Sequence, residues 1–421
     1  MKFFLSSRLF IAFFAVMFVL VNSSGAALMA QSKPQKTEKP TGDGKKNERP
    51  KPLTEEEKKK LEEEKRLLEE EKNAIFIDDI EKVESKIVNV DAVVYNKKSG
   101  QIMVGLKKGN FAIFENGVKQ EITSFAEPES PITVSLVVEY SKWSELFGSA
   151  AGGYFEPGAN EVIKPVAYFL SRFIKPPNDY ASVIAFDLRP TPITDFTNDP
   201  KRLNDTVNLL FRNRPAFREN NLFDAIKFAL IGGRGDSVVL ENSQNEKSDY
   251  LGMVAVKSKR RAIILVASGI DTFSKINYDQ ARRIIQEAGV PIYIISTGNL
   301  FYKKYEHLMP ATDGLTGMPG RMSFLQAQNV MNTIAKESGG AHFPMTFEGE
   351  IPGYLNSING MLRSQYSLSY DLGETKREPG KKNKLEVRVD LDGDGQFDDK
   401  TLIVQHRPFY TTPKPLEVKK K

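Results

Sequence analysis

The strongest constraint on the fold is an alternation of short apolar runs with longer amphipathic segments between residues 129 and 363. The first run, Ile132–Val138, follows Pro131 and has five apolar residues in seven, four of them valine or isoleucine. Such a run is typical of a central parallel strand covered on both faces. Ligands of open α/β sheets bind where such strands end. The turn that begins at Glu139 is therefore the first place to look for a site.

The rest of this region repeats the order of strand and helix. Glycine pairs end two of the helical patterns, and Pro200 stands at the start of another. The pattern predicts an α/β domain with a doubly wound, mostly parallel sheet over residues 129–363. The further strands that we expect are Tyr180–Asp187, Ala262–Ala267, Val290–Ser296 and a short one near His342. The helices that we expect are Asn160–Ile174, Pro200–Leu210, Leu222–Ile231, Tyr278–Ala288, Phe324–Ser338 and Tyr354–Arg363.

Two β segments flank this domain, at residues 79–128 and 364–412. Both alternate apolar and polar residues, and Asn116-Gly117 between two strand-like runs predicts a hairpin. Each segment is too short to bury a sheet alone. We expect them to join as one small β-sandwich, with the α/β domain inserted between them.

The first 30 residues have the features of a signal peptide. Lys2 and Arg8 precede the apolar run Leu9–Val21, and Ala30 is the expected cleavage position, with Ala26 as the alternative. An uncleaved anchor is the other interpretation of this segment. The protein is thus expected to be exported, periplasmic or extracellular, with no membrane span after signal removal.

Low-complexity segments follow the signal peptide and end the chain. Residues 31–53 and 413–421 are rich in lysine and poor in apolar residues, so we expect a disordered linker and a disordered tail. Residues 54–76 are predicted to form a charged helix, with a capping box at Thr54 and Glu57. Leu61 and Leu68 have the heptad spacing of a coiled coil, but two leucines fit a solvated spacer helix as well.

Composition excludes several functions. A net charge of +5 over 421 residues does not indicate nucleic-acid binding. The chain has no cysteine, and its three histidines form no HExxH motif. No phosphate-binding glycine loop or G-x-S-x-G motif is present. Nothing combines a nucleophile, a base and an orienting acid, so we do not expect an enzyme.

The order of segments resembles a von Willebrand factor A-type (VWA) domain, in particular the secreted bacterial, acidobacterial-type group called VWFA-related. The similarity is carried in family order by PITVSLVVEYSKW, ITDFTNDPKRL, ENNLFDAI, RRAIILVASGIDT and GVPIYIISTG. The leading stretch VNVDAVVYNKKSGQIMVGLKKGNFAIFENGVKQEITSF and the closing SQYSLSYDL resemble the β segments of that group. The resemblance covers roughly residues 85–412 and implies a Rossmann-like sheet whose first strand leads into a metal site.

That family's site holds a hard cation, usually magnesium, with oxygen ligands from Asp-x-Ser-x-Ser, a threonine and a later aspartate. At the matching positions this chain departs from the pattern, and Lys142 adds a positive charge. Magnesium tolerates little error in ligand distance and direction. We therefore expect a degenerate site without tightly bound magnesium at Glu139. The positions concerned are Glu139, Ser141, Trp143, Asn220 and Ser268, with Asp271 just beyond the last.

A second candidate site is an acidic loop between two strands. Its carboxylates at alternate positions and Gly395 at the sixth match a calcium loop, but Thr401 stands where the twelfth ligand should be. Weak calcium binding and a metal-free hairpin turn both fit the pattern. The candidate ligands are Asp390, Asp392, Asp394 and Asp398.

Bulky residues are frequent in the loops expected where the parallel strands end, namely 139–160, 188–199, 268–277 and 298–323. We expect this edge to bind a protein partner without a metal. Trp143 could anchor the partner, or it could fold inward and fill the vacated metal cavity. The candidate contact residues are Tyr140, Trp143, Tyr154, Phe155, Phe301, Tyr302 and Tyr305.

These observations lead to an exported, non-enzymatic protein-binding or scaffolding protein. The alternative is a metal-dependent adhesion module, with magnesium or calcium in a working site. Function inferred from a fold is an analogy, so both are expectations.

Overall fold

The computed structural model describes residues 87–146, 150–151, 154–155, 158–212, 215, 217–236, 247–314, 319–373 and 378–412, within one compact unit, Ile77–Lys421. The signal peptide, linker, charged helix and tail expected at 1–30, 31–53, 54–76 and 413–421 lie outside these residues. Among the helices that are described, none has both the length and the apolar character needed to cross a membrane.

The core of the described chain is a six-stranded sheet in the order β14-β13-β12-β5-β8-β9. Strand β9 is antiparallel to β8, and the other neighbours are parallel. All eight residues of β5 are buried, as expected of a central strand. The bounds are Ile132–Glu139 for β5, Tyr180–Phe186 for β8, Pro190–Thr197 for β9, Arg260–Ala267 for β12, Ile292–Ser296 for β13 and His342–Pro344 for β14.

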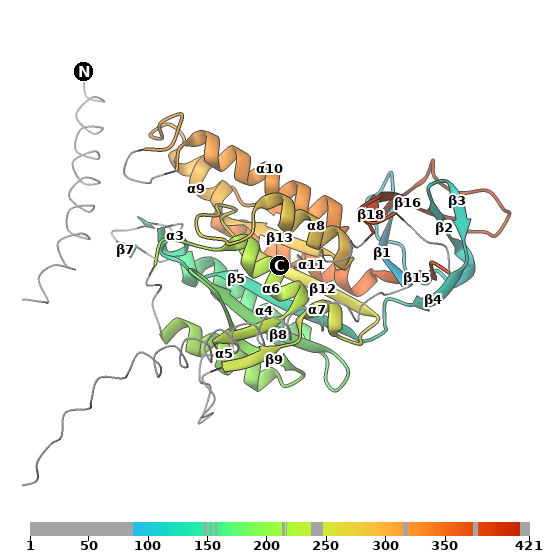
Figure 1. Cartoon of the computed structure of the whole chain (residues 1–421), viewed down its shortest axis with the longest axis horizontal. Coiled ribbons are helices and arrows are strands. Elements are labelled where there is room, and N and C mark those ends of the chain that lie inside the picture. The colour runs from blue at the N-terminus through green and yellow to red at the C-terminus, as the bar shows by residue number, and fades with distance from the viewer. Residues whose placement is uncertain are drawn as a thin grey trace, which may run out of the picture. The chain divides into compact units, whose positions relative to one another are not determined.

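Helices cover both faces of this sheet (Figure 1). Val134 and Leu136 of β5 belong to one apolar cluster with α4, α5 and α11, whereas Val137 belongs to another with α6 and α8. This division follows from the side chains of a strand pointing alternately to the two faces. The helices are α4 (Lys164–Phe173), α5 (Pro200–Arg212), α6 (Leu222–Ile231), α8 (Tyr278–Ala288), α9 (Thr297–Tyr305), α10 (Arg321–Ser338) and α11 (Ile351–Ser364).

The α/β arrangement agrees with the expected doubly wound, mostly parallel sheet and is compatible with a VWA-like fold. Helices α6 and α8 have the expected bounds, and the other expected helices differ from the observed ones by a few residues at their ends. The helix expected from Asn160 begins instead with a π-helical turn, η2 (Ala159–Ile163), before α4.

Two of the expected loops contain regular structure. Residues 188–199 include β9, whose Pro190 and Pro192 are tolerated because β9 is an edge strand. Residues 298–323 begin inside α9, where Leu300 and Phe301 are buried against the core. Gly298 and Asn299 are weak helix formers, so tertiary packing overrides local preference in α9.

Shorter elements complete the α/β part. They are α3 (Lys142–Leu146), β6 (Ala150–Ala151), β7 (Tyr154–Phe155), β10 (Gly233–Asp236), β11 (Lys247–Tyr250), α7 (Gly252–Ala255) and the 3-10 turn η3 (Glu348–Glu350).

The leading and trailing β segments pair with each other, as the blue and red strands in Figure 1 show. They form two four-stranded sheets among the described residues, β17-β1-β15-β4 and β18-β16-β2-β3, which share one apolar cluster. The expected hairpin joins β2 and β3 through Asn116 and Gly117, both with positive φ. The bounds are Ile87–Asn96 for β1, Phe111–Glu115 for β2, Val118–Gln120 for β3, Ile122–Ala126 for β4, Tyr366–Asp371 for β15, Lys382–Val389 for β16, Leu402–Gln405 for β17 and Phe409–Thr411 for β18; the 3-10 turn η1 (Lys108–Asn110) precedes β2.

Candidate functional site

Glu139 is the last residue of β5, and its side chain is only 2 % exposed. Neighbouring parallel strands end beside it, so loops from several elements converge on its carboxylate. Ser141 comes from the turn before α3, Asn220 from the segment before α6, and Ser268 from the residue after β12. The structure thus brings together four of the positions expected from the sequence.

Four protein donors bind the Glu139 carboxylate. Its Oε1 accepts hydrogen bonds from Ser141 Oγ at 2.8 Å and Asn220 Nδ2 at 3.0 Å. Its Oε2 accepts from the backbone N–H and the hydroxyl of Ser268, both at 2.7 Å. Because each oxygen has two donors, the carboxylate connects β5, β12 and the start of α6 without any other group.

Burial raises the pKa of Glu139 above its usual value, and the hydrogen bonds from Ser268, Ser141 and Asn220 act in the opposite direction. The backbone N–H of Ser268 and the Nδ2 group of Asn220 can only donate, and in this arrangement each binds one of the two carboxylate oxygens. The two hydroxyls complete a set that suits the ionised form.

The residues around Glu139 do not suit the octahedral magnesium site that the resemblance implies. A hard cation needs several oxygens that converge on one point. Asn220 directs its Nδ2 toward the carboxylate, and its Oδ1, also buried, receives no hydrogen bond from the described residues. Two of the hydroxyls present, those of Ser141 and Ser268, donate to the carboxylate. In this arrangement the carboxylate and the two hydroxyls are bonded to one another and do not converge on one point.

Asp271 does not join this group. Its Oδ1 accepts a hydrogen bond from the backbone N–H of Phe223, in the first turn of α6, at 3.3 Å and one from Ser274 Oγ at 2.5 Å. A carboxylate at this position stabilises the positive end of a helix. Asp271 therefore caps α6. Our inclusion of Asp271 among the metal-site positions is corrected.

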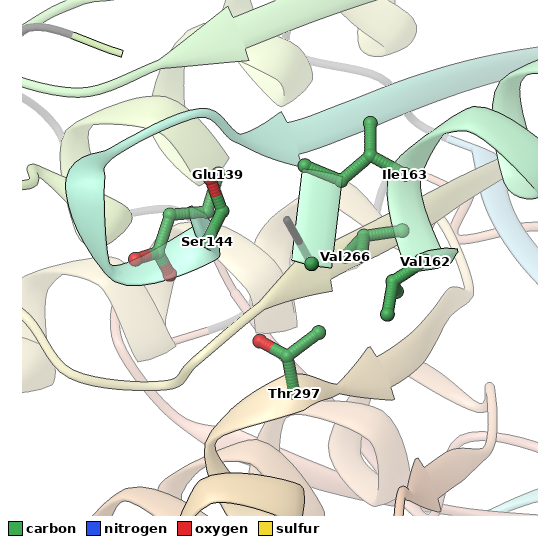
Figure 2. Close-up of a pocket in the computed structure, with 7 residues that line it drawn as sticks. Glu139, Ser144, Val162, Ile163, Val266 and Thr297 are labelled. Carbon is green, nitrogen blue, oxygen red and sulfur yellow. The ribbon is translucent and has the colours of Figure 1, made fainter. Parts of the chain in front are cut away.

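A small cavity lies beside Glu139, between α3, η2 and the start of α9 (Figure 2). It has room for about one water molecule. Apolar side chains of Val162, Ile163 and Val266 line one part, and Ser144 and Thr297 supply hydroxyls. The cavity is too small for an organic cofactor.

Trp143 is buried rather than presented to a partner. Its side chain is 5 % exposed, belongs to the main apolar cluster and meets the ring of Phe301 edge-on, with centroids 6.3 Å apart. Phe301, 6 % exposed, also packs against Tyr305 and Phe324. Of the two alternatives left open for Trp143, the inward-folded one agrees with this burial. The expectation that Phe301 lies on a binding face is corrected, because both rings fill the space between α3, α9 and α10.

The other expected contact residues have mixed positions. Tyr140, Tyr302 and Tyr305 are partly buried against the same cluster. Tyr154 and Phe155 lie on β7, which pairs with β6, and their side chains are outside the described part of the chain.

Two exposed aromatic residues at this edge were missed from the sequence. Phe217 is 47 % exposed and Phe273 is 56 % exposed. The backbone of Phe217 accepts a hydrogen bond from Lys142 N at 2.7 Å, and Phe273 N donates to Asn220 O at 2.8 Å. Both are thus held beside the Glu139 group. The only sequence signal was an apolar residue within a polar loop, which is common on protein surfaces.

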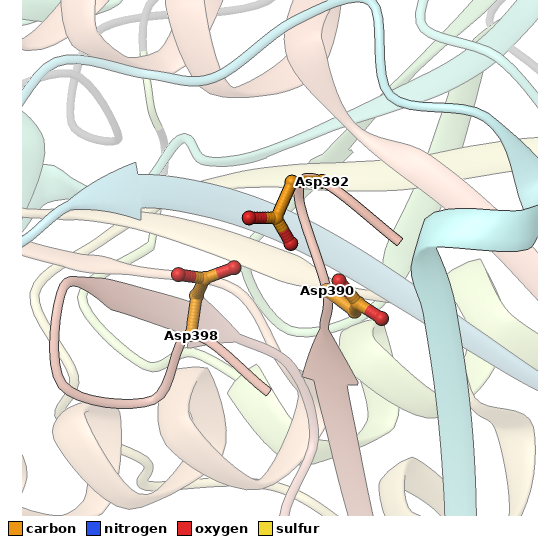
Figure 3. A group of neighbouring side chains, drawn as sticks. All are labelled: Asp390, Asp392 and Asp398. Carbon is orange, nitrogen blue, oxygen red and sulfur yellow. The ribbon is translucent and has the colours of Figure 1, made fainter. Parts of the chain in front are cut away.

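The acidic loop brings three of its four carboxylates together (Figure 3). One oxygen each of Asp390, Asp392 and Asp398 lies within 4.8 Å of the others, and Asp394 is not part of this group. Backbone N–H groups already bind all three of them, since Asp390 accepts from Gly393 and Gly395, Asp392 accepts from Asp394, and Asp398 accepts from Leu391. Hydrogen bonds of this kind support an acidic turn, and weak calcium binding and a metal-free hairpin turn both stay predictions for this loop.

Comparison with known proteins assigns no family. No family model and no curated protein matches the chain. Solved structures with some similarity include the PilB minor pilin from Streptococcus sanguinis, with 12 % identity, a TM-score of 0.37 and coverage of 56 % of this chain and 62 % of that one. Proximal thread matrix protein 1 from the mussel byssus has 11 % identity, a TM-score of 0.34 and coverage of 59 % and 50 %. The conserved hypothetical protein BatB from Bacteroides thetaiotaomicron has 13 % identity, a TM-score of 0.33 and coverage of 55 % and 100 %.

The chain spans about half to three fifths of the length of the first two of these structures. At these identities and TM-scores the similarities carry no argument about function.

Proposed function

We propose that this chain is an exported, non-enzymatic protein-binding or scaffolding protein that belongs to the secreted VWFA-related group and uses its VWA-like site without a metal ion. The observation that carries the proposal is the Glu139 carboxylate, which accepts four hydrogen bonds from Ser141, Asn220 and Ser268. Where a bound cation would connect these loops, the carboxylate connects them itself. The edge then has one fixed conformation in the presence or absence of divalent ions.

The binding face in this proposal is the surface beside that carboxylate. Phe217 and Phe273 expose apolar rings there, and the backbone bonds to Lys142 and Asn220 hold both in place. Aromatic residues, phenylalanine among them, are enriched in protein interfaces relative to the rest of the surface. A protein is therefore the class of partner that suits this face best.

We also propose that the leading and trailing β segments form one β-sandwich into which the α/β part is inserted. The pairing of β1 with β15 and β17, the pairing of β2 with β16 and the common apolar cluster support this arrangement. Paired strands such as β1 and β15 are thus separated in the sequence by the whole α/β part. Such an insertion is feasible because the two ends of a domain often lie close together.

The test is capture of partners from an envelope extract of the source organism, with the full mature chain as bait. We expect the same partner to bind with Mg²⁺ and with EDTA, and to be lost when Phe217 and Phe273 are both replaced by serine. Leu251→Ser is the matched control, because Leu251 is 62 % exposed and precedes β12, at the opposite edge of the sheet.

Two results would contradict the proposal. Loss of capture in EDTA would favour a metal-dependent adhesion module. Capture that survives the double Phe217 and Phe273 substitution would place the binding face elsewhere.

A further inference from the structure

The trailing β segment crosses the C-terminal ends of two helices of the α/β part. Gln405 Nε2 donates to the carbonyl oxygen of Gly340 at 2.8 Å and to that of Gly339 at 3.4 Å, just after α10. Arg407 Nη1 donates at 3.3 Å to the carbonyl oxygen of Gln286, in the last turn of α8. The last carbonyls of a helix have no partner within the helix. Arg407 supplies a donor to one such carbonyl of α8, where its charge suits the negative end of the helix, and Gln405 holds the two residues that follow α10.

Two glycines make this approach possible. Gly289 ends α8 with a φ of 62°, and a Cβ at this position would lie 2.6 Å from Arg407 Nη1. Gly339 ends α10 with a φ of 88°, and its Cβ would lie 2.8 Å from the backbone nitrogen of Arg407. Each glycine thus serves as a left-handed helix end and also leaves room for the crossing segment.

A second arginine joins the two connections between the α/β part and the β segments. Arg260, at the start of β12, is fully buried. Its guanidinium donates to the carbonyls of Pro128 and Ser130, which lead into β5, and to the carbonyl of Leu362, near the end of α11. Because α11 leads directly to β15, one side chain holds both the entry to the α/β part and the exit from it.

Charge is retained in this buried junction. Burial lowers the pKa of Arg260 to about 10 and that of Arg407 to about 10, so both guanidinium groups are protonated at neutral pH. Arg407 also donates to the carbonyl of Asn89 in β1, and Asp91, two residues further along, accepts a hydrogen bond from Ser367. Removal of one partner from a buried charged network leaves the others unsatisfied and is costly.

We propose that Arg260 and Arg407 lock the α/β part and the β segments into one cooperative unit, so that the trailing segment is part of what keeps α8 and α10 folded. All these contacts lie at the edge where β12, β13 and β14 begin, opposite the edge that carries Glu139. The lock therefore leaves the Glu139 edge uncovered. The smallest stable unit must include both β segments.

The test uses the full chain and two probes. Trp143 is the only tryptophan and lies in the α/β part, so its fluorescence reports unfolding of that part. Hydrogen exchange, followed by mass spectrometry, reports β1, β15 and the last turns of α8 and α10. We expect the native Trp143 fluorescence of the wild-type protein and its protection from hydrogen exchange to be lost in one urea transition.

Arg407→Gln should separate the two transitions and speed exchange in the last turns of α8 and α10 about tenfold or more. Arg388→Gln is the control, because Arg388 belongs to the same β segment but its side chain is 40 % exposed. Gln405→Ala is the milder second variant in case Arg407→Gln does not fold, and it should speed exchange after α10 alone. The proposal would be overturned if, in both variants, the two probes still reported one urea transition and the last turns of α8 and α10 exchanged at the wild-type rate.

Discussion

Nδ2 of Asn220 donates a hydrogen bond to Oε1 of Glu139 across 3.0 Å, although 81 positions separate the two residues in the chain. The pair connects the end of β5 to the start of α6, and Ser268 connects the same carboxylate to the end of β12. A buried carboxylate with this set of donors holds three loops at fixed distances from one another. It does so with groups that the chain itself supplies.

Replacement of Glu139 by glutamine should destabilise the protein. Glutamine has one acceptor oxygen where the carboxylate has two, so in the present arrangement either Ser268 N–H or the Asn220 Nδ2 group loses its acceptor. If the Asn220 amide turns over to accept, its Nδ2 group moves to the buried position of Oδ1, which has no hydrogen-bond partner among the described residues. We expect the free energy of unfolding to fall by about 1–3 kcal/mol, the cost of leaving a buried polar group unsatisfied. Urea denaturation followed by Trp143 fluorescence measures it, with Glu145→Gln on partly buried α3 as the control. Equal stability of the Glu139 variant and the wild type would show that the carboxylate is not structural.

Replacement of Trp143 by alanine should remove core packing rather than a binding contact. The indole is buried against Phe301, so truncation should lower the free energy of unfolding by about 3–5 kcal/mol. Trp143→Phe, which retains a ring, should lower it less. Circular dichroism during urea denaturation gives both values. An alanine variant as stable as the wild type, with weakened partner capture, would restore the surface-anchor interpretation.

The acidic loop should bind calcium at most weakly. Its carboxylates are engaged by backbone N–H groups, and the Thr401 hydroxyl donates within the loop to the carbonyl of Asp398 at 3.2 Å. With no bidentate ligand at the twelfth position, we expect a dissociation constant of about 10⁻⁴ M or weaker by isothermal titration calorimetry. Asp390→Asn should abolish any heat of binding. Sub-micromolar affinity would mean that another group replaces the missing ligand.

Acid should destabilise the protein partly through His342. Burial lowers its pKa to about 4, below the ordinary value of 6.5, and no described group accepts from or donates to its Nε2. Between these two values the unfolded chain binds a proton that the folded chain does not, so the free energy of unfolding falls as the pH drops from about 6.5 to about 4.

The difference between the wild type and His342→Gln isolates this contribution, because Glu139 and Asp91 titrate in both proteins. Chemical denaturation at several pH values provides the measurement. The variant should lose less stability than the wild type across that range. Parallel pH profiles would show that His342 is as accessible to protons in the folded protein as in the unfolded chain.

The local pattern of the sequence was enough to place most of the architecture. An apolar run such as Ile132–Val138 is typical of a strand that is covered on both faces of a sheet. A glycine such as Gly289 adopts the left-handed conformation that ends a helix, whatever the surrounding fold. The turn at Asn116-Gly117 needs positive φ angles that few other residues adopt. The resemblance to VWA domains implied that Glu139 and Ser268 belong to one site, and the parallel strands β5 and β12 that lead to them are neighbours in the sheet.

Only the tertiary structure decided the direction of side chains and the contacts between distant segments. Trp143 and Phe301 could equally have faced a partner from their sequence positions, and they turn inward because α3, α9 and α10 enclose a space that their rings fill. In the sequence, Arg260 and Arg407 cannot be distinguished from ordinary surface basic residues. In the structure they donate hydrogen bonds to carbonyls 102 to 318 positions away. Such contacts depend on which buried carbonyls packing leaves without a donor, and no local sequence pattern records that.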